Sequence, residues 1–201
     1  MNTRSRALHI LVGDAGVLIG FLASDQHRQL RKLISDKLSH FQWCVPHVVE
    51  EEIHRWAAKN RMPTVRTRWE WLSRVGPVLV LPPVTHASDP VLVANAARLL
   101  DRQDDELLED THDLGEAFVI AHALSFQAAG LTVVVAIDDS AGARWAREQE
   151  FTNLDTLDLL SMCAKSGIYT SRRELRAAFD AVSKRSRLPT WAKTELPGLF
   201  R

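Results

Sequence analysis

Residues 131–139, LTVVVAIDD, hold the clearest strand pattern in the chain. The run of β-branched and small apolar side chains predicts a short strand that is buried on both faces, as in a parallel sheet. Two acids, Asp138 and Asp139, stand where this strand ends, and residues 140–150, SAGARWAREQE, have the pattern of a helix. A buried strand that leads directly into a helix is the repeating unit of α/β proteins.

The same alternation of strands and helices extends over the rest of the chain. Further strands are predicted near residues 7–13, 41–45, 78–81 and 151–154. Helices are predicted from about residue 15 and within residues 24–40, 47–59, 65–75, 89–103, 114–130, 157–167 and 172–184. Ser24 or Asp25 is available to cap the second helix, and Gly130 to end the helix before residue 131. We therefore predict the α/β fold class, with three layers and a mainly parallel central sheet.

The domain organisation follows from the same pattern. We expect residues 1–168 to form the α/β domain, within which residues 61–112 make a less regular, mainly helical arm. Residues 169–201 are predicted to form a helical C-terminal tail. The chain has no internal repeat and no low-complexity segment.

Composition narrows the class of protein. A chain of 201 residues that is 46% hydrophobic can bury one core, and the balance of 25 basic against 25 acidic residues argues against a disordered or strongly cationic protein. Cys44 and Cys163 lie in apolar contexts, so we expect them to be reduced and buried. The chain has neither a signal-peptide pattern nor an apolar run of about 18 residues, so we expect a cytoplasmic protein that does not enter a membrane.

Acids stand at three junctions between a predicted strand and the next helix. Asp14 follows the first strand, Asp138 and Asp139 follow the strand at residues 131–137, and three glutamates at residues 50–52 open the helix after Pro46. In open α/β sheets such junctions converge on one crevice. At about 100° per residue, Glu52 falls within the apolar arc of its helix, while the other two glutamates point toward solvent. The alternative for each acid is a helix cap or a favourable first-turn charge.

The segment at residues 114–124, LGEAFVIAHAL, places Glu116 in a helix that has no wide polar face. An ionised carboxylate there needs a compensating arginine or metal ion, because burying an unpaired charge costs several kcal/mol. The alternative is a capping arrangement, in which Asp113 is the N-cap and Glu116 is the third helical residue.

Four motifs in order resemble those of the PIN-domain nucleases, in particular the VapC-like toxins: GDAGVLI, VPHVVEEEI, DLGEAFVIAHAL and VVVAIDDSAGARWA. The resemblance covers roughly residues 7–165 and implies a PIN-like fold. It also implies a site that binds Mg²⁺ or Mn²⁺ through Asp14, Glu116 and either Asp138 or Asp139, with Glu52 orienting water or a second ion. Such hard cations prefer oxygen ligands.

The resemblance implies an endoribonuclease that is the toxin of a toxin–antitoxin pair, acts on RNA, is held silent by a small antitoxin protein and forms a homodimer. A housekeeping RNA-processing nuclease of the same fold is one alternative. The other is a binding module without catalysis, because Ala15 and Gly16 replace the hydroxyl or amide residue usual in the first motif. The last motif also lacks a Thr before its acid and leaves Ser140 as the nearest hydroxyl.

Two basic clusters could hold a polyanion such as RNA. The alternative is that they form solvated helix faces over buried tryptophans. The first cluster lies in the arm and interleaves Arg61, Arg66, Arg68 and Arg74 with Trp69 and Trp71; the second lies in the tail and contains Arg172, Arg173, Arg176, Lys184, Arg185 and Arg187.

Overall fold

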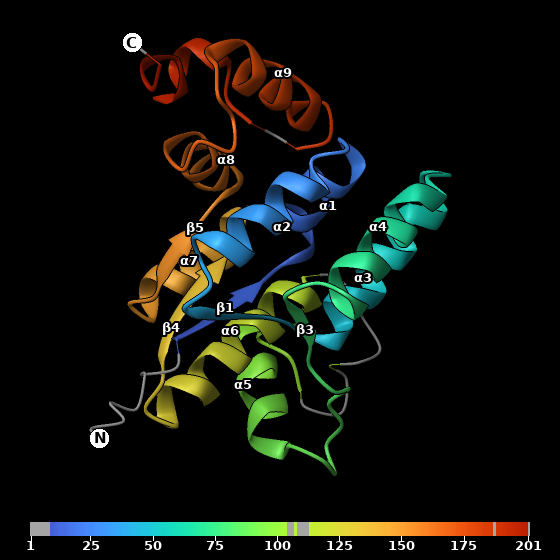
Figure 1. Ribbon diagram of the computed structural model, residues 1–201. Helices are drawn as coiled ribbons and strands as arrows, with labels where there is room; N and C mark the ends of the chain where they lie inside the picture. Colours follow the sequence, from blue (N-terminus) through green and yellow to red (C-terminus); the bar gives the residue numbers. More distant parts are fainter. Residues whose placement is uncertain (1–8, 104–106, 108–112, 187, 201) are drawn as a thin grey trace, which may run out of the picture.

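A five-stranded parallel sheet forms the centre of the computed structural model, which describes residues 9–103, 107, 113–186 and 188–200 (Figure 1). Its order is β3-β2-β1-β4-β5. The strands are β1 (His9–Gly13), β2 (Phe41–Val45), β3 (Val78–Val80), β4 (Thr132–Ala136) and β5 (Thr152–Leu154). All four pairings are parallel, which confirms the predicted sheet.

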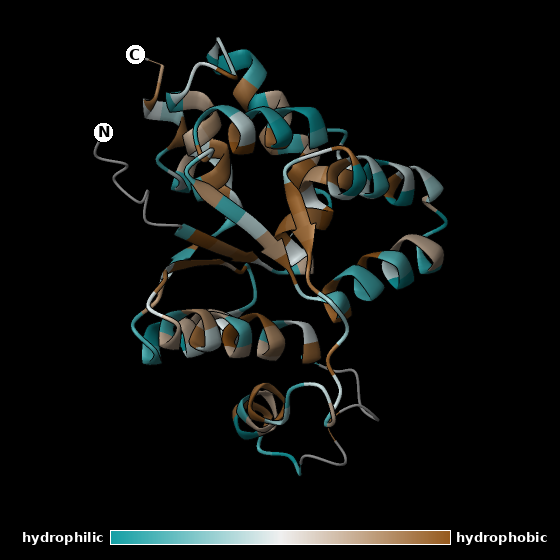
Figure 2. Cartoon of the chain, turned by 60° about the horizontal axis from the view of Figure 1, so that its bottom comes forward, coloured by the Kyte–Doolittle hydropathy of each residue, from teal (hydrophilic) through white to brown (hydrophobic). Residues whose placement is uncertain are grey.

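Helices cover both faces of this sheet, so the three-layer α/β/α fold is confirmed (Figures 1 and 2). Helices α1 (Ala15–Ala23) and α2 (His27–Asp36) cover one face, and α6 (Leu114–Ala128) packs on β1 and β4 from the other. Beside α6 lie α5 (Pro90–Leu100) and α7 (Ser140–Glu148), while α3 (His47–Lys59) and α4 (Pro63–Arg74) pair with each other and contact α1.

The central strands are buried because a helix layer covers each side of them. Leu11 and Val12 of β1 and Val135 and Ala136 of β4 have no exposed surface. Figure 2 shows these strands as mostly hydrophobic ribbon between more mixed helices. The continuous apolar pattern of residues 131–137 therefore reflects burial on both faces of the sheet.

The C-terminal part of the chain packs on the same core. Helix α8 (Thr156–Lys165) contacts α2, and α9 (Arg172–Ser183) contacts α1 and α8. Two short 3₁₀ turns follow, at Trp191–Lys193 and Leu196–Gly198. Just after α9, the Ser186 hydroxyl lies so close to Gly20 that a Cβ there would stand 2.8 Å from it. The predicted helical tail thus lies against α1, and the division at residue 168 stays a prediction.

The strand predicted near residues 78–81 is confirmed as β3, which pairs with β2 inside the sheet, and the extent of the arm at residues 61–112 stays a prediction. One local prediction needs correction. Neither Ser24 nor Asp25 caps α2: Ser24 ends α1, whereas Asp25 has a positive φ of 63° and pairs with Arg68 at 2.8 Å. Gly130, with φ 79°, lies just past the end of α6 as predicted.

Both cysteines are free and buried, as predicted. None of the helices in the described ranges combines the length and apolar character needed to span a lipid bilayer.

A close approach between neighbouring strands makes Gly13 intolerant of a side chain. A Cβ at Gly13 would collide with the indole of Trp43, which is 1% exposed. The collision involves the indole Nε1, which has no hydrogen-bond partner in the described part of the chain. Replacing this indole by a phenyl ring therefore removes the obstacle without breaking a hydrogen bond.

We predict that Gly13→Ala lowers the free energy of unfolding by about 1–3 kcal/mol, because it overpacks the sheet. In a Trp43→Phe background, Gly13→Ala should lower the free energy of unfolding by less. Urea denaturation of the wild type, the two single variants and the double variant measures this difference as a double-mutant cycle. Equal penalties in both backgrounds would contradict the proposed clash.

Candidate active site

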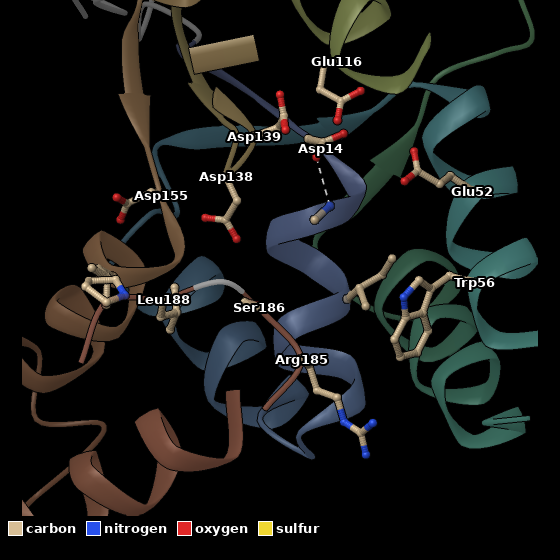
Figure 3. A pocket seen from close by; sticks show the side chains of 14 residues that line it. Asp14, Glu52, Trp56, Glu116, Asp138, Asp139, Asp155, Arg185, Ser186 and Leu188 are labelled. Carbon is tan, nitrogen blue, oxygen red and sulfur yellow. Dashed lines mark hydrogen bonds between the residues drawn. The ribbon is translucent and has the colours of Figure 1, made fainter. Parts of the chain in front are cut away.

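The carboxyl ends of the strands meet in a crevice beside β1. Strands β2 and β3 lie on one side of β1, and β4 and β5 lie on its other side, so the order of the strands reverses at β1. Such a switch point leaves a crevice beyond the strand ends. A pocket of about 490 Å³ opens there, and all five acids singled out in the sequence line it: Asp14, Glu52, Glu116, Asp138 and Asp139 (Figure 3).

Asp14 is the most deeply buried of these acids, at 2% exposure. Its backbone N–H donates to the Ala136 carbonyl at 2.9 Å, which fixes the end of β1 against β4. Its Oδ2 accepts the Gly16 N–H at 2.9 Å and so caps α1, while Oδ1 has no partner among the described residues. Burial and then the charge of Glu52 raise the pKa of Asp14 to about 7.

Glu116 stands at the start of α6, which is buried from Leu114 to Ala123 apart from Glu116 itself. Burial and then the charge of Asp14 raise the pKa of Glu116 to about 7. Asp113 occupies the N-cap position with a φ of 55°, but its side chain makes no capping hydrogen bond. The capping alternative is therefore not what holds Glu116 in place.

The three consecutive glutamates of α3 have three different environments. Glu52 lines the pocket, and burial followed by the charge of Glu116 raises its pKa to about 7. Glu51 is exposed and pairs with Arg55 at 3.9 Å. Glu50 was expected to face solvent, but it is half-buried and accepts the Trp69 indole N–H at 2.9 Å. The helical periodicity thus predicted the inward position of Glu52. It did not predict the hydrogen bond between Glu50 and Trp69 of α4.

Gly115 allows the carboxylates to approach α6. A Cβ at this position would stand 2.8 Å from Oε2 of Glu52 and 3.3 Å from Oδ1 of Asp14. Any side chain at residue 115 would therefore push these two carboxylates away from the start of α6. Gly115 carries no signal in the sequence, because the close approach involves residues from three separate elements.

Asp138 and Asp139, which the sequence did not separate, have different partners. Asp138 accepts two hydrogen bonds from Thr156 at the start of α8, one from its N–H at 2.8 Å and one from its hydroxyl at 2.6 Å. Burial raises the pKa of Asp138. Asp139 caps α7 through the Ala141 N–H at 2.7 Å, and its charge contributes to the raised pKa of Glu116. The hydroxyl that supports this motif is therefore Thr156 and not Ser140.

Another acid, Asp155, also lines the pocket and was missed. It follows β5, caps α8 by accepting the Asp158 N–H at 2.8 Å, and forms a capping box with Asp158. The signal was present in the sequence as an acid after a predicted strand with a second acid three residues later. Its capping role explains the residue without any function in the site.

The two basic clusters predicted from the sequence differ in how far their side chains are used in contacts within the protein. In the arm, Arg66 pairs with Glu70 at 3.0 Å, Arg68 donates to the Leu22 carbonyl at 2.6 Å, and Trp69 is buried. In the tail, Arg176 pairs with Asp180 at 2.8 Å, whereas Arg185 lines the acidic pocket. Arg187 lies outside the described residues. The arm cluster is thus largely occupied by internal contacts, while the tail brings one arginine to the site.

The donor set of the pocket suits a hard divalent cation. Its candidate ligands are carboxylate oxygens, and the buried Oδ1 of Asp14 lacks the hydrogen bond that such an atom normally has. Within the described ranges, no three His, Cys, Asp or Glu side chains already stand as a complete metal cage. Mg²⁺ does not require one, since it keeps several waters and usually takes only one or two carboxylates.

Comparison with known proteins adds no family assignment. No protein-family model matches this chain, and a search of curated proteins found no significant match.

The raised pKa values give the metal-free protein a defined pH dependence. Between about pH 4 and 7 the folded state binds protons to Asp14, Glu52 and Glu116 more tightly than the unfolded state does. The free energy of unfolding should therefore fall as pH rises through this window. Asp14→Asn should flatten the fall, since the amide cannot ionise and its oxygen can still accept the N–H of Gly16.

At pH 8, Mg²⁺ or Mn²⁺ should reverse this loss of stability. An ion at 100 times its Kd stabilises the folded state by about 2.7 kcal/mol, which raises Tm by roughly 5–11 °C for a chain of this size. Thermal melts with and without EDTA measure the shift. A shift of the same size in Asp14→Asn and Glu116→Gln would rule out these residues as ligands.

Proposed function

We propose that this chain is a divalent-metal-dependent endoribonuclease built on a PIN-like fold. The observation that carries the proposal is the convergence of five acids from β1, α3, α6 and the end of β4 in one half-buried pocket. Acids placed only for capping have no reason to share a crevice in which burial and mutual repulsion raise their pKa values. The five-strand order and the four motifs that resemble those of the PIN-domain nucleases support the same conclusion.

The roles of the side chains follow from their partners. Asp14, through its free Oδ1, and Glu116 would hold Mg²⁺ or Mn²⁺, with Asp139 or Asp138 beside them. When bound, the ion supplies Lewis acidity to the phosphate and lowers the pKa of a coordinated water. Glu52 lines the same pocket and, as a carboxylate, can accept a proton from the attacking water. Thr156 holds Asp138 in a fixed orientation.

The overall reaction is hydrolysis of one phosphodiester bond. The water oxygen forms a new bond to phosphorus, the bond to the 3′-oxygen breaks, and the leaving oxygen takes up a proton. The pocket needs no covalent intermediate with the protein, because its acids can position and deprotonate water directly.

A binding module without catalysis is the second candidate. It is favoured by the observation that no complete cage of three ligands stands ready within the described residues. The missing hydroxyl at residues 15 and 16 has the same implication. Such a module would bind RNA or protein and cleave nothing.

We predict that the protein cleaves single-stranded RNA in Mg²⁺ or Mn²⁺ and loses activity in EDTA. Asp14→Asn and Glu116→Gln should each lower the cleavage rate by at least about 10²-fold, because each removes a charge that stabilises the transition state through the ion. Glu51→Gln is the matched control, since Glu51 is an exposed acid next to Glu52. Gel analysis of end-labelled RNA measures the rates, and full activity of both variants would contradict the site assignment.

We also propose that the chain is a toxin that forms a homodimer and is neutralised by a small antitoxin protein. Its expression in a bacterial host should then arrest growth, and the product of an adjacent small gene should restore it. Asp14→Asn should abolish the arrest. Cleavage without growth arrest would favour the housekeeping nuclease instead.

A further inference from the structure

The pocket has two chemically different ends. Figure 3 shows Glu116, Asp139 and Asp14 grouped at one end, with Trp56 and Arg185 well away from that group. The lining also includes the apolar residues Ile19, Leu188 and Pro189, and Figure 3 shows Leu188 on the side of the pocket opposite Trp56. The carboxylates therefore occupy only part of the pocket, and the remainder offers an aromatic ring, apolar side chains and a cation.

Trp56 differs from the other tryptophans in its surroundings. Of the six in the chain, Trp71 is half-buried but already contacts the His27 ring and the Arg31 guanidinium. Trp56 is also half-buried and packs partly on the core, yet no hydrogen bond, ring stack or cation contact of its ring occurs within the described ranges. The other four are buried: Trp43, Trp69, Trp145 and Trp191. Trp56 is thus an aromatic ring that lines a pocket without an aromatic or cationic partner.

The position of Trp56 on α3 couples it to the acidic end of the pocket. Trp56 lies four residues after Glu52, so the two side chains share one face of the helix at a rise of about 6 Å. A flat group that stacks on Trp56 is therefore held about one helical turn from the carboxylates. In a nucleic acid substrate, that group is a base next to the reacting phosphate.

Arg185 is the cation at this end of the pocket. It is exposed, and its guanidinium makes no ion pair or hydrogen bond with any residue that the structure describes. Figure 3 shows the guanidinium directed away from the carboxylates, so its charge is available to an anionic ligand. Ser186, the next residue, packs against Gly20 of α1, so the docked tail fixes the backbone beside Arg185.

We propose that Trp56 and Arg185 form a nucleotide subsite beside the carboxylates and that this subsite takes an unpaired nucleotide of RNA. The base stacks on the Trp56 indole, and a phosphate next to it pairs with the Arg185 guanidinium. This inference rests on the proposed nuclease function and names the residues that would bind its unpaired substrate beside the carboxylates. Only an unpaired base can present its face to an aromatic ring, because in a duplex the neighbouring bases cover both faces.

The test measures binding apart from cleavage. The full chain carrying Glu116→Gln, which keeps the RNA intact, is titrated into a fluorescently labelled single-stranded RNA in Mg²⁺ and followed by anisotropy. Adding Trp56→Ala should weaken binding by about 5- to 150-fold, whereas Trp56→Phe should retain most of the affinity. The same RNA annealed to its complement should bind weakly and should not respond to Trp56→Ala.

Arg185 is tested by salt dependence. Arg185→Gln should lower the slope of log Kd against log salt concentration by about 0.7, the value for one phosphate contact on a single strand. Arg185→Lys should restore most of the slope. Arg172→Gln is the matched control, because Arg172 is an exposed tail arginine that does not line the pocket, and its slope should equal that of the parent.

Parent-like binding of single-stranded RNA by both Trp56→Ala and Arg185→Gln would overturn the subsite. Because Arg185 is exposed, its variant tests the proposal even if Trp56→Ala fails to fold. If the wild type never cuts RNA but binds it in a manner that depends on Trp56 and Arg185, the subsite stands and the nuclease function fails. If cleavage depends on Asp14 but both variants bind RNA as the parent does, the nuclease function stands and the subsite fails.

Discussion

The burial of neighbouring carboxylates, together with the repulsion between their charges, is the constraint on which the site depends. Five parallel strands end at one edge of the sheet, and the acids that follow β1 and β4 meet those at the starts of α3 and α6 there. Burial and mutual charge raise the pKa of Asp14, Glu52 and Glu116 to about 7. A divalent cation would offset both effects, because it supplies the positive charge that the described lining provides only through Arg185.

Hydrogen bonds around the pocket hold these acids in place despite the unfavourable burial and repulsion of their charges. Asp14 is fixed by its N–H bond to β4 and by the Gly16 N–H, while Thr156 engages both oxygens of Asp138. The two acids differ in their partners, since Oδ1 of Asp14 has none among the described residues and each oxygen of Asp138 accepts one hydrogen bond. Gly115 lets two of the carboxylates approach the start of α6. Oδ1 of Asp14 is thus a buried carboxylate oxygen that a cation could satisfy.

Segments that look accessory in the chain contribute directly to the architecture and to the site. Residues 61–112 supply the edge strand β3, and Trp69 within them satisfies the buried side of Glu50. The C-terminal segment supplies the wall opposite the acids through Arg185 and Leu188, because α9 and Ser186 dock on α1. A truncation designed from the sequence boundary at residue 168 would therefore remove part of the pocket.

Local patterns in the chain were enough to predict the strands, most of the helices, the α/β class and five of the six pocket acids, Asp155 being the exception. Burial periodicity and strand-end acids are properties of neighbouring residues. The partner of Asp138, the environment of Glu50, the closeness of Gly115 to two carboxylates and the presence of Trp56 and Arg185 in one pocket depended on the folded arrangement. Each joins residues that are far apart in the chain, and no periodicity records which distant side chain fills a given space or completes a given hydrogen bond.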